Sequence, residues 1–448
     1  MKFKYRVMHM TNARKMALGF FFVIIAGAFL LMLPFSSRSG EWTSPLQALF
    51  TATSSTCVTG LIVVDTYQHW TLFGQMVILI MIQIGGLGFI TIGVIFSMFL
   101  NRKISLERRN LIQESVSSMQ LSGVVRLVRH IVRGTVIAEG IGALILAIRF
   151  IPRCGFFEGI YFSIFHSISA FCNAGFDLMG KYNAYSSLTG YYDDPIVNIT
   201  IMALIVVGGI GFIVWDDIKN NKLHFKRYRL HTKIVLITTA VLIFASALLF
   251  GIFERNNLMQ GMGTKDTVLT SLFASVTART AGFNTIDLGA MTQASKFLTV
   301  ILMFIGGSPG STAGGIKTTT IVIMMVYIWS NLRNSSGCNI MGRRIGDEDI
   351  KKASMVLGLN MGMAVAALLI ISAMQVFPME DLMLEVFSAI GTVGLSTGIT
   401  RQLGCVSQIV IMLLMYCGRI GSMTFALTFA FKKKKVPVLY PEEKVNVG

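Results

Sequence analysis

One short pattern occurs four times along this chain, and it limits the possible folds more than any other feature. Each copy begins with an aliphatic–Phe pair, continues with small and hydroxyl residues and ends at a glycine. The copies begin at Leu49, Ile164, Leu272 and Val386 and end at Gly60, Gly175, Gly282 and Gly394. These glycines are 115, 107 and 112 residues apart, so four successive units of similar length fill the chain.

The four units lie in a strongly apolar chain. Of its 448 residues 53% are hydrophobic and only 14% are charged, whereas about 25% of the residues of a soluble protein are charged. Apolar runs of about 20 residues, enough to cross a hydrocarbon core of roughly 30 Å, recur along the whole length without a soluble domain between them. We therefore expect one integral membrane domain over residues 1–448 that lies in a lipid bilayer.

Each unit reads as a spanning helix, a shorter helix, a glycine-ended loop and a second spanning helix. The first spans are predicted near 17–33, 131–151, 234–253 and 354–377. The short helices are predicted near 45–56, 158–171, 266–277 and 380–390, and the second spans near 71–100, 195–215, 296–330 and 406–431. The repeats then cover 16–100, 131–216, 232–330 and 352–431. This predicts an all-α membrane protein with eight transmembrane helices and four re-entrant loops around one pseudo-four-fold pore.

The charge pattern gives the topology. The formal net charge is +17, and 28 of the 39 Lys and Arg residues fall in five segments: 1–15, 101–133, 215–233, 331–352 and the tail from 432. Under the positive-inside rule these segments are cytoplasmic, so both termini, 1–15 and 432–448, lie inside and the number of crossings is even. The positive charge therefore indicates membrane orientation rather than a nucleic-acid partner.

The glycine-ended loops have the chemistry of a cation filter. Non-helical backbone at membrane depth is tolerated only where it is buried in protein or lines water. A dehydrated cation needs oxygen ligands, and glycine allows backbone that aims successive carbonyls at one point. Helix packing is the alternative explanation for a single glycine-rich stretch, but four copies in register favour a filter. The predicted K⁺-binding residues are Val58, Thr59, Gly60, Asn173, Ala174, Gly175, Thr280, Ala281, Gly282, Thr392, Val393 and Gly394.

The second span of the third unit contains a glycine-rich stretch that would break a helix near the bilayer centre. We interpret it as a gate below the filter. Its residues are Gly306, Gly307, Ser308, Pro309, Gly310, Ser311, Thr312, Ala313, Gly314, Gly315 and Lys317. It is not a phosphate-binding P-loop, because Ile316 separates Gly315 from Lys317 and no strand precedes it.

Single charged residues in apolar segments are further candidates. Arg419 lies within the last span, where it could form an electrostatic barrier to cations or a structural pair with a carbonyl or an acid. Arg279 lies in a filter loop and would tie that loop to its neighbours. Asp65, Asp177 and Asp287 follow filter glycines and would either concentrate cations at the outer mouth or be ordinary loop acids. No cluster of acids, bases or nucleophiles indicates an enzyme.

With these motifs the sequence resembles the Trk/Ktr/HKT superfamily of potassium transporters, and most of all the membrane subunit of bacterial Ktr systems. The four filter glycines, the stretch Gly310–Lys317 and Arg419 carry the resemblance. It implies potassium selectivity, since Gly60 replaces the Ser of sodium-preferring plant relatives. It also implies an intramembrane gating loop at 306–317 and a pore-lining gating role for Arg419. The Ser308–Pro309 pair departs from the family pattern.

The resemblance further implies partners that the chain does not contain. Members of the family form homodimers in the bacterial plasma membrane and dock on a cytoplasmic, nucleotide-binding regulatory subunit of the RCK type. Sodium is a candidate activator of transport in such systems, and no cofactor is expected in this chain. The alternative function is a coupled secondary cation transporter, a sodium or proton symporter with alternating access, because such proteins also use broken helices and internal repeats.

Overall fold

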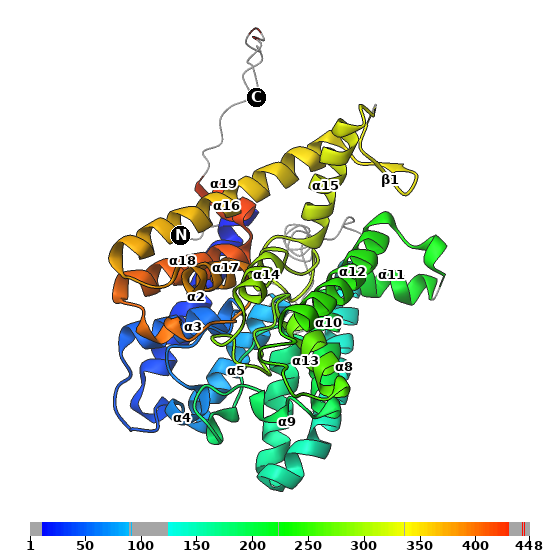
Figure 1. Ribbon diagram of the computed structural model, residues 1–448. Coiled ribbons are helices and arrows are strands. Elements are labelled where there is room, and N and C mark those ends of the chain that lie inside the picture. The colour runs from blue at the N-terminus through cyan, green and yellow to red at the C-terminus, as the bar shows by residue number, and fades with distance from the viewer. Residues whose placement is uncertain are drawn as a thin grey trace.

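The computed structural model describes residues 11–88, 91, 124–222, 224–335, 337–429, 441 and 443, and this part of the chain is mainly helical. Most of the predicted cytoplasmic termini and of segment 101–133 lie outside the described residues. Two short strands, β1 (Asn339–Ile340) and β2 (Arg343–Arg344), form an antiparallel pair. Figure 1 shows the first and last units on one side of the molecule and the two middle units on the other.

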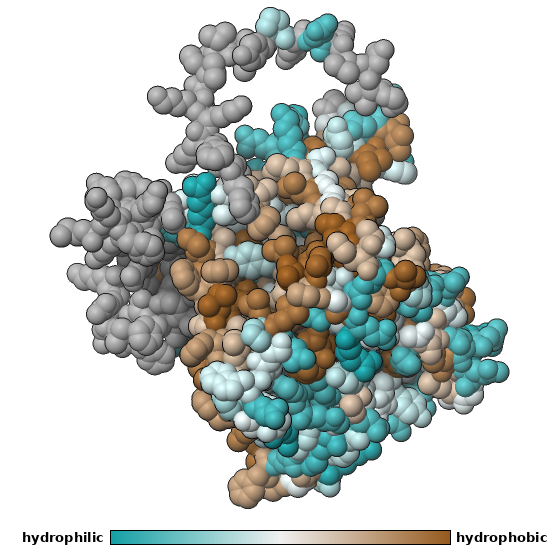
Figure 2. Space-filling model, turned by 90° about the vertical axis from the view of Figure 1, so that its left-hand side faces the viewer, coloured by the Kyte–Doolittle hydropathy of each residue, from teal (hydrophilic) through white to brown (hydrophobic). Residues whose placement is uncertain are grey.

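The first helix of each unit is long enough and apolar enough to span a bilayer. These helices are α2 (Asn12–Met32), α8 (Val124–Cys154), α12 (Leu230–Phe253) and α16 (Asp347–Met374). Each contains most of the span predicted from the sequence. Large apolar side chains on them, such as Phe22, Leu144 and Leu248, are exposed, as expected of surfaces that face lipid. Figure 2 shows hydrophobic residues gathered across the middle of one face of the molecule, with hydrophilic residues gathered below them.

The short helix of each unit, called the pore helix below, follows the first helix. The four pore helices are α3 (Pro45–Thr56), α9 (Phe156–Phe171), α13 (Thr264–Thr277) and α17 (Met379–Gly391), and their ends lie within two residues of the predicted ones. The aromatic residue of each repeated aliphatic–Phe pair is buried in one large apolar core. These residues are Phe50, Phe165, Phe273 and Phe387. The repeated Phe therefore anchors each pore helix to the same core.

The second helix of each unit is shorter than predicted. These helices are α5 (Leu72–Leu87), α10 (Pro195–Gly209), α14 (Gln293–Phe304) and α18 (Cys405–Ile420). Three of them end next to a glycine with positive φ: Gly88 (+81°), Gly211 (+95°) and Gly421 (+94°), a conformation that only glycine adopts readily. After Gly211 the chain turns by 93° into α11 (Phe212–Asn221), and after Gly421 it continues as α19 (Ser422–Phe429). The predicted continuous spans to residues 215 and 431 are therefore broken; residues 89–90 and 92–100 of the first predicted span lie outside the described part.

The third second helix is interrupted as the sequence predicts. It stops at Phe304, and helix resumes only with α15 (Thr318–Leu332), so residues 305–317 form a non-helical segment. We call this segment the inner loop. The remaining short helices are α4 (Thr66–His69), η1 (Pro34–Ser36), η2 (Met179–Lys181), η3 (Thr189–Tyr191), η4 (Phe225–Arg227) and η5 (Ile399–Gln402).

The four units close into a ring. Within each unit the pore helix packs against the first helix of its own unit. The second helix packs against the pore helix of the next unit: α5 on α9, α10 on α13, α14 on α17, and α18 on α3. Because the last of these contacts returns to the first unit, a single chain surrounds one central axis.

The helix break at Gly211 gives a stability prediction. A Cβ at this position would meet the carbonyl oxygen of Pro309, and φ is +95°. Gly211→Ala should therefore cost at least about 1–2 kcal/mol, visible as a lower thermal unfolding temperature of the purified protein in detergent. Gly140→Ala is the matched control, since Gly140 lies in α8 with nothing near its Cβ position, and should be neutral or slightly stabilising. Equal unfolding temperatures for the two variants would contradict this account of the break.

Candidate functional site

The four glycine-ended loops share one unusual backbone conformation. The residue two positions before each glycine has a positive φ: Val58 (57°), Asn173 (59°), Thr280 (74°) and Thr392 (51°). The four glycines are positive as well, at 95°, 68°, 85° and 93° for Gly60, Gly175, Gly282 and Gly394. Positive φ is uncommon for any residue with a side chain and is a marked outlier for β-branched residues. Its recurrence at corresponding positions indicates that the ring imposes it.

The loops meet edge to edge around the axis. A Cβ added to each glycine would strike the neighbouring loop at the carbonyl oxygen of the residue before that loop's own glycine. The pairs are Gly60 with Ala174, Gly175 with Ala281, Gly282 with Val393, and Gly394 with Thr59. The series closes on itself, so the four loops form one ring. Glycine is required at these positions because a side chain would push adjacent loops apart.

Hydroxyl residues near the end of each pore helix accept hydrogen bonds from backbone N–H groups of the filter loops. The N–H of the residue before each glycine donates to a carbonyl near the end of its own pore helix. These bonds run from Thr59 to Ser54 (2.8 Å), Ala174 to Ser169 (2.8 Å), Ala281 to Thr277 (3.0 Å) and Val393 to Ser388 (2.8 Å). The Ser54 and Ser388 hydroxyls also accept from the N–H of Gly60 (3.1 Å) and Gly394 (3.0 Å). The sequence analysis missed these four residues, although a hydroxyl five or six positions before each glycine was a visible signal.

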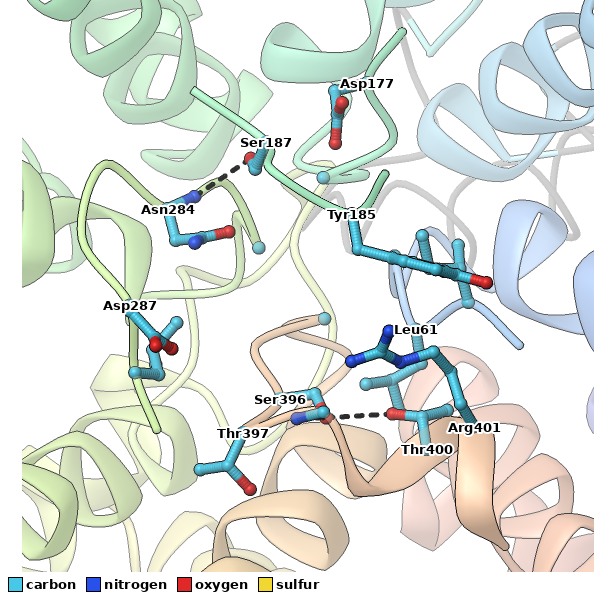
Figure 3. Close-up of a pocket in the computed structure, with 17 residues that line it drawn as sticks. Leu61, Asp177, Tyr185, Ser187, Asn284, Asp287, Ser396, Thr397, Thr400 and Arg401 are labelled. Atoms are coloured by element: carbon cyan, nitrogen blue, oxygen red, sulfur yellow. Dashed lines mark hydrogen bonds between the residues drawn. The ribbon is translucent and has the colours of Figure 1, made fainter. Parts of the chain in front are cut away.

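A cavity of about 150 Å³ lies at one end of the ring, and we call it the outer mouth (Figure 3). All four filter glycines line it, together with Asp177 and Asp287. Burial raises the pKa of Asp177 to about 7, and the Asp65 carboxylate acts in the same direction, against the hydrogen bond that Asp177 accepts from the Met179 N–H. Two of the three predicted mouth acids therefore line the cavity.

Asp65, the third predicted mouth acid, does not line this cavity. Its Oδ1 accepts from the N–H groups of Tyr67 (2.9 Å) and Gln68 (2.8 Å) and so caps α4. Its Oδ2 accepts from the N–H of Tyr185 at 2.8 Å, which ties the outer loop of the second unit to the first. Asp65 is thus a buried residue that caps a helix and joins two units, rather than a mouth acid or a solvated loop acid.

On the other side of the ring from the outer mouth, backbone hydrogen bonds tie the inner loop to two helices, α10 and α18. The Ser308 N–H donates to the carbonyl of Gly209 (3.0 Å), and the Thr312 N–H donates to that of Gly208 (3.3 Å), both at the end of α10. The Gly315 N–H donates to the carbonyl of Gly418 in α18 (3.3 Å). The glycines at the ends of the second helices therefore receive the loop, because they leave room for its backbone to approach.

Arg419 joins the inner loop to the first unit. Its guanidinium donates to the carbonyl of Thr312 in the loop and to those of Gly85 and Gly86 (3.1 Å to Gly86) at the end of α5. Lys317 ties the loop to itself, since its Nζ donates to the carbonyls of Ala313 (2.6 Å) and Gly314 (3.1 Å). Arg419 therefore pairs with carbonyls, which is one of the two alternatives considered from the sequence, the other being an electrostatic barrier. It lies between the loop and the first unit.

Arg279 lies where the sequence analysis placed it, in the filter loop of the third unit. Its guanidinium donates to the hydroxyl of Thr239 on α12 at 3.4 Å, and its side chain is buried. At the inner end of the fourth loop, the position of a Cβ on Gly314 coincides with the Thr392 side chain. The filter of the fourth unit and the inner loop are therefore in direct contact.

Comparison with known proteins identifies the relatives of this arrangement. The family model described as cation transport protein, TrkH, matches residues 4–436. The potassium/sodium uptake protein NtpJ of Enterococcus hirae is 41% identical over 96% of both chains. The Ktr system potassium uptake protein B of Bacillus subtilis is 40% identical over 98% of this chain and 97% of its own, and the protein of that name from Vibrio alginolyticus is 35% identical over 97% and 94%.

Among solved structures, the crystal structure of the potassium transporter TrkH from Vibrio parahaemolyticus superposes with a TM-score of 0.72. It covers 92% of this chain and 83% of its own at 17% sequence identity, and so shows the shared fold. The family model spans nearly the whole chain, and three relatives match it at full length. The chain therefore belongs to the TrkH family of cation transport proteins, which are multi-pass membrane transporters rather than enzymes.

Proposed function

We propose that this chain takes up potassium ions through a pore in which the four loops are the selectivity filter. The observation that carries the proposal is the closed ring of loops, whose N–H groups before the glycines are bonded back to the pore helices. This leaves the backbone carbonyls as the polar groups available to a dehydrated cation. The pore helices end at the ring, so their C-terminal partial negative charge also favours a cation there. Relatives named as potassium uptake proteins support potassium as the ion.

The inner loop and Arg419 are the proposed gate. The loop crosses from α14 to α15 directly below the fourth filter segment, and Arg419 ties it to the glycines at the end of α5. A guanidinium held at this depth is a positive charge that opposes the passage of cations, as arginines do in other selective pores. Opening requires the bonds that Arg419 makes between the loop and α5 to break, which exposes the path between the first and third units.

We further propose that the protein is the membrane subunit of a two-component system in the bacterial plasma membrane, with both termini in the cytoplasm. Relatives named as Ktr system components support a partner subunit, and we propose that it is a separate cytoplasmic, nucleotide-binding regulatory subunit of the RCK type on which a homodimer of this chain docks. The basic segments 215–233 and 331–352 would supply part of the docking surface. The relative named as a potassium/sodium uptake protein supports sodium as an activator or second ion.

Rubidium uptake into vesicles containing the purified protein tests the mode of transport. A potassium gradient alone should drive accumulation of radioactive rubidium, because a filter conducts without a coupled ion. Adding sodium should change the rate without being required. A strict requirement for sodium or for a proton gradient would instead establish the coupled secondary transporter with alternating access.

Gly60→Ser tests the filter. A serine Cβ would strike the Ala174 carbonyl and also carry the strain of a φ of +95°, so adjacent loops should separate and sodium should permeate better relative to potassium by several-fold. Gly40→Ser is the matched control, since Gly40 has a φ of +71° but nothing near its Cβ position. Competition of sodium against rubidium uptake gives the ratio. An unchanged ratio for Gly60→Ser would remove this loop from the filter.

Two substitutions at Arg419 test the gate. Arg419→Gln should raise rubidium flux several-fold in the absence of any partner, because both the charge and the ties to Thr312, Gly85 and Gly86 are lost. Arg419→Lys keeps the charge but cannot reproduce the fork of donors. If Arg419→Lys has the flux of the wild type, the positive charge closes the gate. If its flux is raised, the hydrogen bonds of Arg419 close the gate. Arg333→Gln, an exposed position beside Trp329, is the control. Flux in Arg419→Gln at or below that of the wild type would refute the gating role.

A further inference from the structure

The outer mouth contains one basic side chain among its lining residues. Arg401 belongs to η5, just beyond the filter loop of the fourth unit, and lines the same cavity as the four filter glycines. Figure 3 shows its guanidinium pointing into this cavity, beside the ring of Tyr185. A positive charge at the entrance of a cation pore opposes the very ions that enter it, so its position needs an explanation.

No acid neutralises Arg401 in the part of the chain that the structure describes. Its guanidinium carbon instead lies 4.2 Å from the centre of the Tyr185 ring, a cation–π contact that orients the group but leaves its charge in place. Lys296 shows the contrast. Its amine, at the outer end of α14, pairs with both Glu380 and Asp381 at 3.2 Å. The charge of Arg401 is therefore available to act on ions in the mouth.

Hydrogen bonds to other elements hold the backbone on both sides of the Arg401–Tyr185 contact. Tyr185 has a φ of +60°, and its N–H donates to Asp65, whose other oxygen caps α4. On the other side, Thr400 precedes Arg401, and its hydroxyl donates to the buried carboxylate of Glu385 at 2.6 Å. Glu385 belongs to the pore helix α17 and also accepts from Ser396 at 2.7 Å. The Arg401–Tyr185 pair is thus built on a pore helix and on a cap in another unit.

We propose that Arg401 is a specificity-determining residue that keeps divalent cations out of the mouth. The inference rests on the proposed cation filter. Asp287, and Asp177 where it is ionised, attract cations into the same cavity, and this attraction grows with ionic charge. Arg401 offsets it, and the electrostatic energy between a fixed charge and an ion is proportional to the charge of that ion. A divalent ion therefore feels twice the repulsion of potassium, so any factor by which Arg401 weakens potassium binding is squared for a divalent cation.

Arg401→Gln makes this relation measurable. In rubidium uptake at low ionic strength, with osmolality kept by sorbitol, the variant should show an apparent KM for rubidium that is lower by about two- to five-fold. At rubidium concentrations well below KM, the half-inhibitory concentration of external Mg²⁺ should fall by the square of that factor. Both effects should shrink as choline chloride is added, because salt screens exposed charges.

Three variants serve as controls. Arg401→Lys keeps the charge and should stay close to the wild type. Tyr185→Leu releases the guanidinium without removing it and should lie between the wild type and Arg401→Gln. Arg255→Gln removes an exposed charge from another outer loop, away from the residues that line the mouth, and should change neither value. Equal Mg²⁺ inhibition of Arg401→Gln and the wild type at low ionic strength, or a fall no larger than that of the rubidium KM, would overturn the proposal.

A binding measurement separates this inference from the proposed function. Stabilisation of the purified protein against heat, titrated with RbCl or MgCl₂, reports cation binding without transport. If the wild type takes up no rubidium, the proposed function fails, yet the half-saturating Mg²⁺ concentration should still be lower in Arg401→Gln. If the wild type transports rubidium but the variant binds Mg²⁺ no more tightly, only the role of Arg401 fails.

Discussion

The structure depends on how a non-helical backbone satisfies its polar groups inside a membrane. No water is available in the hydrocarbon region, so every buried N–H needs a partner within the protein. In each unit the N–H before the filter glycine finds one at the end of its own pore helix, on Ser54, Ser169, Thr277 or Ser388. These N–H groups are thereby bonded, and the carbonyl oxygens of the loops remain as ligands. A loop whose N–H groups are bonded within the protein is tolerated at membrane depth. The same loop presents carbonyl oxygens that can replace the water around a cation.

The ring of helices follows from the same requirement. A loop that projects into the centre is buried only if neighbours cover it, and each pore helix is covered by the second helix of the preceding unit. The second helices in turn break at glycines, and these breaks admit the inner loop to the carbonyls of Gly208, Gly209 and Gly418. Equal units thus form the filter, whereas the unequal third unit supplies the segment that crosses beneath it.

The sequence predicted the units and pore helices well because their signals are local. The aliphatic–Phe pair, the hydroxyl residues and the terminal glycine fixed each pore helix to within two residues. The glycine-containing stretches at Gly211 and Gly421 indicated breaks, but the predicted spans still ran through them to 215 and 431, because a glycine within an apolar run is equally compatible with close helix packing. The distance of Asp65 from Gly60 left both a mouth acid and an ordinary loop acid open, and neither interpretation anticipated its partner Tyr185, which lies in another unit. Contacts of this kind depend on ring closure, which no local pattern encodes.

Two arginines without a carboxylate partner in the described part of the chain lie at opposite ends of the filter. Their surroundings differ, and so does the degree to which salt screens their charges. Arg419 is partly buried and donates to three carbonyls, so salt screens its field less than the field of an exposed charge. Arg401 is exposed to solvent and rests on an aromatic ring, so its field weakens as salt is added. The inner charge is therefore suited to a gate, because its effect depends less on the salt concentration. The outer one is suited to grading which ions reach the filter.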